Sequence, residues 1–160
     1  MTMTPEQTLK LLGRLVGSWT TEATHPAMPG VVVHGTADIE WLEGERFLIN
    51  RSRTDHPEFP DSISIIGFSD SDRVDPASRR VHTAGQLTMN YFDSRGVSRI
   101  LEASIDETAW RLSRIAPGFS QRFTGTFANG GNTIEGLWQL CEDETHWNDD
   151  VAITFRRTKT

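Results

Sequence analysis

Two similar proline-containing segments carry the side chains best suited to proton transfer. They read His25-Pro26-Ala27-Met28-Pro29-Gly30 and His56-Pro57-Glu58-Phe59-Pro60-Asp61. Imidazole titrates near neutral pH, and Asp55 is placed to orient the neighbouring ring, so His25, Asp55 and His56 are the candidate catalytic residues for acid–base chemistry. The alternative is that proline stiffens two surface loops whose histidines are solvated. Because these side chains lack the fixed spacing of metal ligands, we predict no metal site.

Two arginines between these segments suggest recognition of an anion. Residues 31–41 alternate apolar and polar side chains, as a strand with one buried face does, and a loop at 43–45 leads into a second strand at 46–54. This pairing predicts that Arg51 and Arg53 face inward, opposite small residues. There they would grip a carboxylate or phosphate as an anion clamp. The alternatives are rim arginines that reach water, or an internal ion pair with one of three acids: Glu22, Glu102 or Glu135.

The same register predicts which side chains form the core. It sets Trp41 opposite Phe47 and Ile39 opposite Ile49. The side chains expected to point inward are Ile39, Trp41, Phe47, Ile49, Phe123, Phe127, Ile134 and Trp138.

Four apolar side chains complete the predicted ligand contacts. Trp138 and Phe123 are expected to form the cavity wall, on strands that also carry glycine at inner positions. Met28 and Phe59, one in each proline-containing segment, are expected to cover the opening as lid contacts. The alternative for these two is packing within their own loops.

The elements that must position these residues are almost all strands. A helix is predicted over about residues 5–16, with Thr4 as N-cap, Pro5 in the first turn and leucines at helical spacing. Strand patterns follow near residues 18–24, 31–42, 46–54, 62–69, 80–84, 88–92, 97–105, 109–115, 121–128, 133–140 and 150–157. Short strands in meander order predict an antiparallel up-and-down β-barrel of roughly ten strands that follows one short N-terminal helix.

Composition limits the range of functions. The 160 residues are expected to form one domain, 1–160, with the barrel at about 17–158. The net charge of −6 argues against a nucleic-acid partner. With no apolar segment of signal or membrane-spanning length and with one cysteine, Cys141, we expect a cytoplasmic protein without membrane insertion.

Several motifs resemble those of calycin-type barrels. These are Gly17-Ser18-Trp19, Glu40-Trp41-Leu42, Arg122-Phe123-Thr124-Gly125-Thr126-Phe127 and Asn132-Thr133-Ile134-Glu135-Gly136-Leu137-Trp138. The chain is similar to bacterial barrels described as fatty-acid-binding-protein-like and, more distantly, to the nitrobindin haem barrels. The resemblance implies a barrel fold. Asp150 stands where nitrobindins carry the haem-ligating histidine, and since a carboxylate is a poor haem ligand, no cofactor is predicted.

The favoured function is therefore binding of a small, largely apolar or amphipathic molecule inside the barrel, with an anionic group as one option. The alternative is an enzyme that performs isomerisation or cyclisation on such a molecule at the barrel mouth. A filled barrel serving as an interaction module is a third hypothesis. A homodimer stays open.

Overall fold

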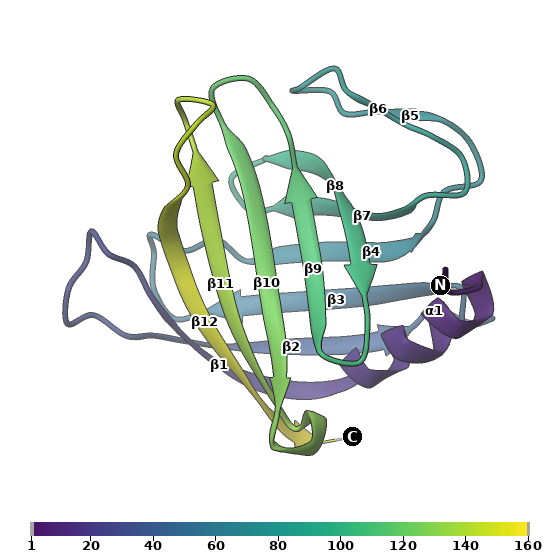
Figure 1. Cartoon of the computed structure of the whole chain (residues 1–160). Helices are drawn as coiled ribbons and strands as arrows, with labels where there is room; N and C mark the ends of the chain where they lie inside the picture. The colour runs from purple at the N-terminus through teal and green to yellow at the C-terminus, as the bar shows by residue number, and fades with distance from the viewer. Residues whose placement is uncertain (1, 160) are drawn as a thin grey trace.

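Ten antiparallel strands close a β-barrel in the computed structural model, which describes residues 2–159 (Figure 1). Neighbours in the barrel follow chain order, and β1 pairs with both β2 and β12 to close it. The strands are β1 (Gly17–Thr24), β2 (Val33–Trp41), β3 (Phe47–Thr54), β4 (Ser62–Phe68), β7 (Leu87–Asp93), β8 (Ser98–Ile105), β9 (Ala109–Arg114), β10 (Ser120–Ala128), β11 (Thr133–Cys141) and β12 (Asn148–Lys159). This confirms the predicted all-β fold with its short N-terminal helix.

The two ends of the barrel carry different connections and helices. In Figure 1, β9 to β12 stand upright, whereas β2, β3 and β4 cross behind them at a steep angle. We call one end the mouth; it carries the connections at residues 25–32, 55–61, 94–97, 115–119 and 142–147. The opposite end carries α1 (Pro5–Leu12), the 3-10 turn η1 (Gly13–Leu15) and the 3-10 turn η2 (Asn129–Gly131). The predicted lid loops do emerge together at the mouth, because alternate connections of an up-and-down barrel share an end.

The N-terminal helix plugs the end opposite the mouth. Thr4 caps α1 as predicted: its hydroxyl accepts from the Gln7 backbone N–H at 3.1 Å, and the Gln7 side chain accepts from the Thr4 N–H at 2.8 Å. Leu12 and Leu15 are fully buried. The Trp19 indole N–H donates to the Leu15 carbonyl at 3.0 Å, which joins the plug to β1.

The apolar core fills the half of the barrel next to the helix. Its buried members include Trp19, Ile39, Leu48, Ile66, Met89, Leu101, Ile105, Trp110, Leu112, Phe123, Ile134 and Phe155. Within residues 2–159, no helix is of a length and hydropathy that would let it cross a membrane.

The β2–β3 register corrects one part of the sequence analysis. Trp41 pairs with Leu48 rather than Phe47, and Ile39 pairs with Asn50 rather than Ile49, because the connection is one residue longer than predicted. Leu42 N–H donates to the Phe47 carbonyl, so residues 43–46 form the turn, with Glu45 at a positive φ of 55°. A one-residue slip moves a whole strand to its other face.

The inward assignments of Phe47, Ile49, Arg51 and Arg53 are therefore wrong, since the burial pattern of β3 places all four outside. The structure favours this register because it buries Leu48 completely and leaves both guanidinium groups in water. The other predicted inward residues lie in the core or pack against it: Ile39, Trp41, Phe123, Phe127, Ile134 and Trp138.

The connection between β4 and β7, residues 69–86, forms a flap rather than a barrel strand. The predicted strand at 80–84 is reduced to β6 (Val81–His82), which pairs with β5 (Arg73–Val74) in a separate two-stranded sheet. Figure 1 shows this flap at the upper right, above β7 and β8.

One buried carboxylate of the flap bridges a seam in the barrel wall. The β8–β9 ladder runs from Ile105 only to Glu102, so the Ile100 N–H has no partner on β9. Fully buried Asp75 accepts from that N–H at 3.3 Å and from the Arg114 Nε at 3.2 Å. Burial by itself raises the pKa of Asp75, but hydrogen bonds from Ser78 and the charge of Arg114 outweigh it and hold the pKa below its usual range.

The close approach of β1, β2 and β3 depends on Gly35. A Cβ built at Gly35 would lie 2.2 Å from the Arg53 carbonyl oxygen and 2.8 Å from the Thr21 hydroxyl. We expect Gly35→Ala to lower the free energy of unfolding by about 1–3 kcal/mol, because backbone must move to admit the methyl group.

Urea unfolding followed by tryptophan fluorescence measures the Gly35→Ala change. The matched control is Gly13→Ala, where the nearest atom to the new methyl is 3.9 Å away, in ordinary contact. The two variants should differ clearly in midpoint, and equal midpoints would show that β2 tolerates a side chain at position 35.

Candidate functional site in the mouth half of the barrel

A row of polar side chains crosses the inner wall of the barrel just above the core. Asn50, Ser64, Tyr91 and Arg99 are consecutive partners across β3, β4, β7 and β8. Because side chains alternate along a strand, these four share the face of the core residues two positions away, such as Leu48 and Ile66. Asn50 and Ser64 are buried, and the Ser52 hydroxyl donates to the Asn50 side-chain oxygen at 3.2 Å. The row makes one wall of the mouth half hydrophilic.

Arg99 is the charged member of this row, and it has no carboxylate partner. Its guanidinium donates to the neighbouring Ser98 carbonyl at 2.8 Å and forms no ion pair with any acid of residues 2–159. The two other arginines at inner positions are well satisfied. Arg114 binds Asp75, and Arg157 stacks 4.1 Å from the Trp19 ring and donates to backbone carbonyls. Half-buried Arg99 is thus a cation available to a ligand.

The facing wall is aromatic. Phe123 on β10 and Trp138 on β11 are cross-strand partners with ring centroids 5.0 Å apart, and Trp110 on β9 lies 5.0 Å from Phe123 in an edge-to-face arrangement. A Cβ built at Gly136 would lie 2.6 Å from the Phe123 ring, so glycine is required for that ring to lie against β11. Trp138 is only partly buried, so aromatic surface reaches the mouth half. The interior therefore offers a polar wall opposite an apolar one.

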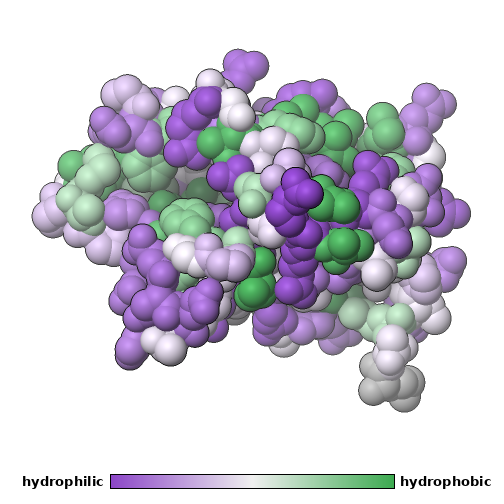
Figure 2. All heavy atoms as spheres, turned by 90° about the horizontal axis from the view of Figure 1, so that it is seen from above, coloured by the Kyte–Doolittle hydropathy of each residue, from purple (hydrophilic) through white to green (hydrophobic). Residues whose placement is uncertain are grey.

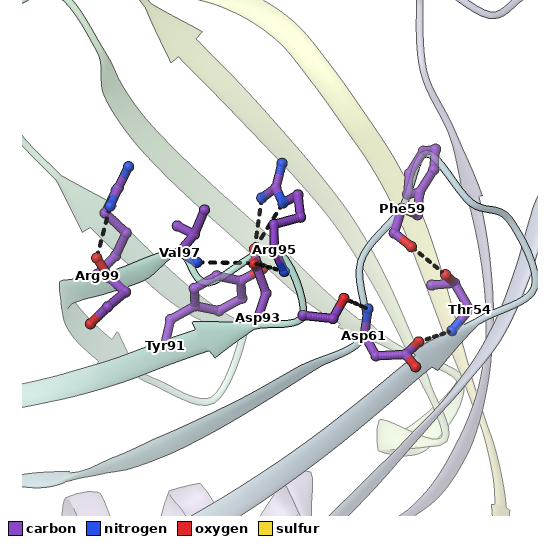
Figure 3. Close-up of polar contacts among 10 residues, drawn as sticks. Thr54, Phe59, Asp61, Tyr91, Asp93, Arg95, Val97 and Arg99 are labelled. Atoms are coloured by element: carbon purple, nitrogen blue, oxygen red, sulfur yellow. Dashed lines mark hydrogen bonds and ion pairs between the residues drawn. The ribbon is translucent and has the colours of Figure 1, made fainter.

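The β7–β8 turn at the edge of the site is fixed by Asp93 (Figure 3). Its fully buried carboxylate accepts from the Tyr91 hydroxyl at 2.8 Å, from Arg95 Nη2 at 2.7 Å and from the backbone N–H groups of Arg95 and Val97. Burial opposes ionisation, but the hydrogen bonds from Arg95 and Tyr91 outweigh it and lower the pKa of Asp93 to about 2.

This cluster also defines the state of Tyr91. Burial and the adjacent Asp93 raise the pKa of the Tyr91 phenol above its ordinary value, so Tyr91 is a neutral hydroxyl across the physiological range. It is a hydrogen-bonding group rather than an acid–base catalyst. In Figure 3 the side chains of Arg95 and Arg99 extend to the same side of the strands.

The predicted catalytic histidine His25 is engaged by protein partners at both ring nitrogens. Its Nε2 lies 2.6 Å from an Asp150 carboxylate oxygen, and its Nδ1 accepts from the Ala27 backbone N–H at 3.0 Å. This assigns the proton to Nε2 and leaves no free nitrogen for a substrate. The contact ties the 25–32 connection to β12.

The other two catalytic candidates do not join His25. Asp55 accepts from the His34 backbone N–H at 3.0 Å, which fastens the start of its loop to β2. The Nδ1 of His56 accepts from the Glu58 N–H at 3.1 Å. Each of the three residues serves its own loop, and their side chains make no hydrogen bond or ion pair with one another within residues 2–159.

The structure also shows the surroundings of the predicted lid residues and of the predicted anion clamp. Phe59 packs edge-on against His56 of its own loop, with centroids 6.0 Å apart, and Met28 is half-buried in the 25–32 connection. The loop of Phe59 is held to the β7–β8 turn because the Asp61 N–H donates to the Ser94 hydroxyl at 3.1 Å. Arg51 lies outside the barrel, 3.0 Å from Glu40.

Sequence reasoning missed Asn50, Tyr91 and Arg99. A signal for Arg99 was present: residues 99, 101, 103 and 105 read Arg, Leu, Ala and Ile at period 2, which places an arginine on the apolar face of a predicted strand. No comparable signal distinguishes Asn50, because its inward position depends on the length of the β2–β3 turn.

The upper face of the molecule is hollowed (Figure 2). Viewed from above, where Figure 1 places the β9–β10 and β11–β12 connections, the surface shows a hollow with hydrophobic side chains in its wall. Apolar groups inside a concave opening are the usual character of small-molecule sites.

Comparisons with known proteins support the fold. No family model matches the sequence, and no curated protein matches it. The structure is similar to the crystal structure of Rv2717c from M. tuberculosis, with a TM-score of 0.60 and 14% identity over 98% of this chain and 99% of that chain. It is also similar to the S-type phycobiliprotein lyase CPES from Guillardia theta, with a TM-score of 0.53 and 13% identity over 99% of this chain and 94% of that chain. These likenesses support the fold, a closed antiparallel β-barrel that follows a short N-terminal helix.

Proposed function

We propose that this barrel binds a small amphipathic molecule that carries an anionic group, in the mouth half of its interior. The observation that carries the proposal is Arg99, a half-buried arginine at an inner position with no carboxylate partner among residues 2–159. An inward charge in a barrel is costly unless it is paired or solvated. A ligand carboxylate or phosphate would pair with it, with Tyr91 and Asn50 alongside.

The rest of the ligand would lie against the aromatic wall. We propose Trp138 and Phe123 as its apolar contacts and Met28 and Phe59 as lid contacts over the opening, as in the sequence analysis. Arg51 and Arg53 are not part of this site because they face outside. An anionic head and an apolar body thus match the two opposing walls.

Binding is favoured over the acid–base enzyme by one specific observation. Both nitrogens of His25 are engaged within the protein, and neither Asp55 nor His56 contacts that ring. General acid–base catalysis requires a group within reach of a substrate proton. We therefore propose a binding protein. An enzymatic role would rest on His56, because the hydrogen bond of its ring uses Nδ1 and not Nε2.

The residues at the position of the nitrobindin haem ligand do not fit an axial haem site. Asp150, at the position of the nitrobindin ligand, has a carboxylate oxygen 2.6 Å from Nε2 of His25. Because Nδ1 of His25 accepts from the Ala27 N–H, His25 has no free ring nitrogen for iron. A carboxylate is a poor axial ligand. We propose a barrel related to the fatty-acid-binding-protein-like and nitrobindin group that acts in the cytoplasm without haem.

The test is a titration of the tryptophan fluorescence with decanoate and decanol, to which Trp138 contributes as the partly buried tryptophan of the aromatic wall. We expect saturable binding of decanoate at the interior site, with decanol binding there at least about tenfold more weakly because it cannot form a charge-assisted bond to Arg99. If neither probe binds at millimolar concentration, the proposal is refuted. Equal affinities would retain a cavity but remove its preference for anions.

A further inference from the structure

A second hollow lies outside the barrel wall. It is a groove of about 510 Å³ between the start of α1, the outer face of β3, β4 and β7, and the base of the flap. The cross-strand partners Phe47, Gly67 and Thr88 and, one row nearer the mouth, Ile65 and Asn90 form its floor. All five occupy outward positions, so the sheet itself separates this groove from the interior site. Its volume falls in the range of small-molecule pockets.

The floor of this groove is more apolar than the outer face of β10 and β11. Phe47 is 38% exposed, and the same outer face continues toward the mouth through half-buried Ile63 to Phe92, which is 44% exposed. The outer face of β10 and β11 instead carries polar side chains such as Thr124, Thr126 and Glu135. An apolar patch of this kind on one face marks a contact surface.

Two arginines stand at the rim of the groove. Arg46 forms no ion pair within residues 2–159, and Arg73 has one loose contact, 3.7 Å from the highly exposed Asp70. Asp70 is also the one carboxylate among the lining residues. Two cations against one acid are notable in a chain of net charge −6. On the floor, Thr88 and Asn90 add a hydroxyl and an amide.

We propose that this groove is a second binding site, for a free anionic amphiphile such as a medium-chain carboxylate. The anionic head would lie between Arg46 and Arg73, and the alkyl chain would lie on Phe47 and Ile65. The argument is charge complementarity over an apolar floor, and it is independent of the proposed interior site.

The experiment is an NMR titration of the amide resonances with decanoate, below its micellar concentration, in the Arg99→Met variant, which weakens the interior site. We expect saturable shifts at Ser69, Gly85 and Thr88. The double variant Arg46→Met/Arg73→Met, made in the same background, should bind roughly threefold to thirtyfold more weakly, as expected for two partly exposed charge contacts. Decanol should bind both proteins equally.

A matched control removes the same charge from the same outer face. Arg51 and Arg53 lie on β3 outside the groove lining, so Arg51→Met/Arg53→Met should leave the groove affinity unchanged. Ile65→Thr, which keeps a β-branched residue in the strand, should weaken decanoate and decanol alike.

Three results would overturn the proposal. The first is decanoate shifts confined to interior residues. The second is an equal loss in the groove and control double variants, which would indicate a general charge effect. The third is perturbation of the groove by anionic phospholipid vesicles with none by free decanoate, which would assign this face to a membrane surface.

Discussion

Replacing Asp75 by asparagine should lower the free energy of unfolding by about 3–5 kcal/mol, the usual cost of leaving one member of a buried ion pair without its partner. Asp75 is fully buried, Arg114 is 4% exposed, and the closest Nη2–carboxylate distance is 3.2 Å. The substitution keeps the shape of the side chain but removes its charge, so the Arg114 guanidinium stays buried without compensation. The asparagine amide keeps only one acceptor oxygen, so either the Ile100 N–H or the Arg114 Nε and Ser78 N–H would face an NH2 group in place of an acceptor.

The matched control is the exposed pair of Arg51 and Glu40. This pair has a similar contact distance, 3.0 Å, but its side chains are 51% and 66% exposed. Glu40→Gln should therefore change the free energy of unfolding by less than about 1 kcal/mol. Urea unfolding of both variants makes the comparison. Similar small losses in the two would contradict the assignment of Asp75 as the bridge of the seam.

A double-mutant cycle and an acid titration test the same pair further. The loss in Asp75→Asn/Arg114→Met should be smaller than the sum of the single losses by about 1–3 kcal/mol, since each single change leaves the same interaction broken. The pKa of Asp75 lies below its usual range, so its ionised form stabilises the fold above the unfolded pKa of about 3.9. That contribution is lost as the pH falls through the folded-state pKa. The stability difference between wild type and Asp75→Asn should accordingly shrink below about pH 4.

Replacing Arg99 by methionine should weaken binding of decanoate by about 2–5 kcal/mol, which is roughly thirtyfold or more. The physical reason is that the ligand carboxylate, once enclosed by the mouth, would keep its desolvation cost but lose its charged partner. Methionine preserves the apolar stem, so decanol should bind the variant nearly as well as it binds wild type. Calorimetric titration with both probes measures the difference.

Arg53→Met is the control for Arg99→Met. It removes the same charge from the same barrel, but Arg53 is exposed on the outer face of β3. Its effect on decanoate binding should be less than about 1 kcal/mol. If the two variants weaken decanoate equally, the effect is long-range charge and the interior site lacks an anion anchor. Urea unfolding of Arg99→Met tests whether the variant is folded, which we expect because the guanidinium makes no ion pair within residues 2–159.

The fold could be predicted from the sequence because its signals are local. Alternation of apolar and polar residues, turn glycines and the Thr4-Pro5 helix start are each readable over a few residues, and the barrel follows from their order. The same local patterns correctly placed Trp41, Phe123 and Trp138 on the inner side.

The candidate site was less accessible because it depends on register. One extra residue in the β2–β3 turn moves Arg51 and Arg53 outside and brings Asn50 inside. No side chain in the turn specifies its length, since the choice between registers is made by burial of Leu48 against the assembled core. The two His-Pro loops do emerge at the same end of the barrel, but the partner of His25 is Asp150, which is 125 residues away in the chain.

The sequence by itself determined the class of fold, the helix that plugs it and the faces of most strands, because those follow from periodicity within each element. Tertiary structure decided which of the inward arginines is left with only a local hydrogen bond within residues 2–159. Arg114 and Arg157 stand on the inner side as Arg99 does, yet the flap supplies Asp75 to the first and backbone carbonyls satisfy the second. Whether a charge is paired depends on which residues long-range packing brings within about 4 Å of it. The periodicity of one strand does not indicate which residues those are.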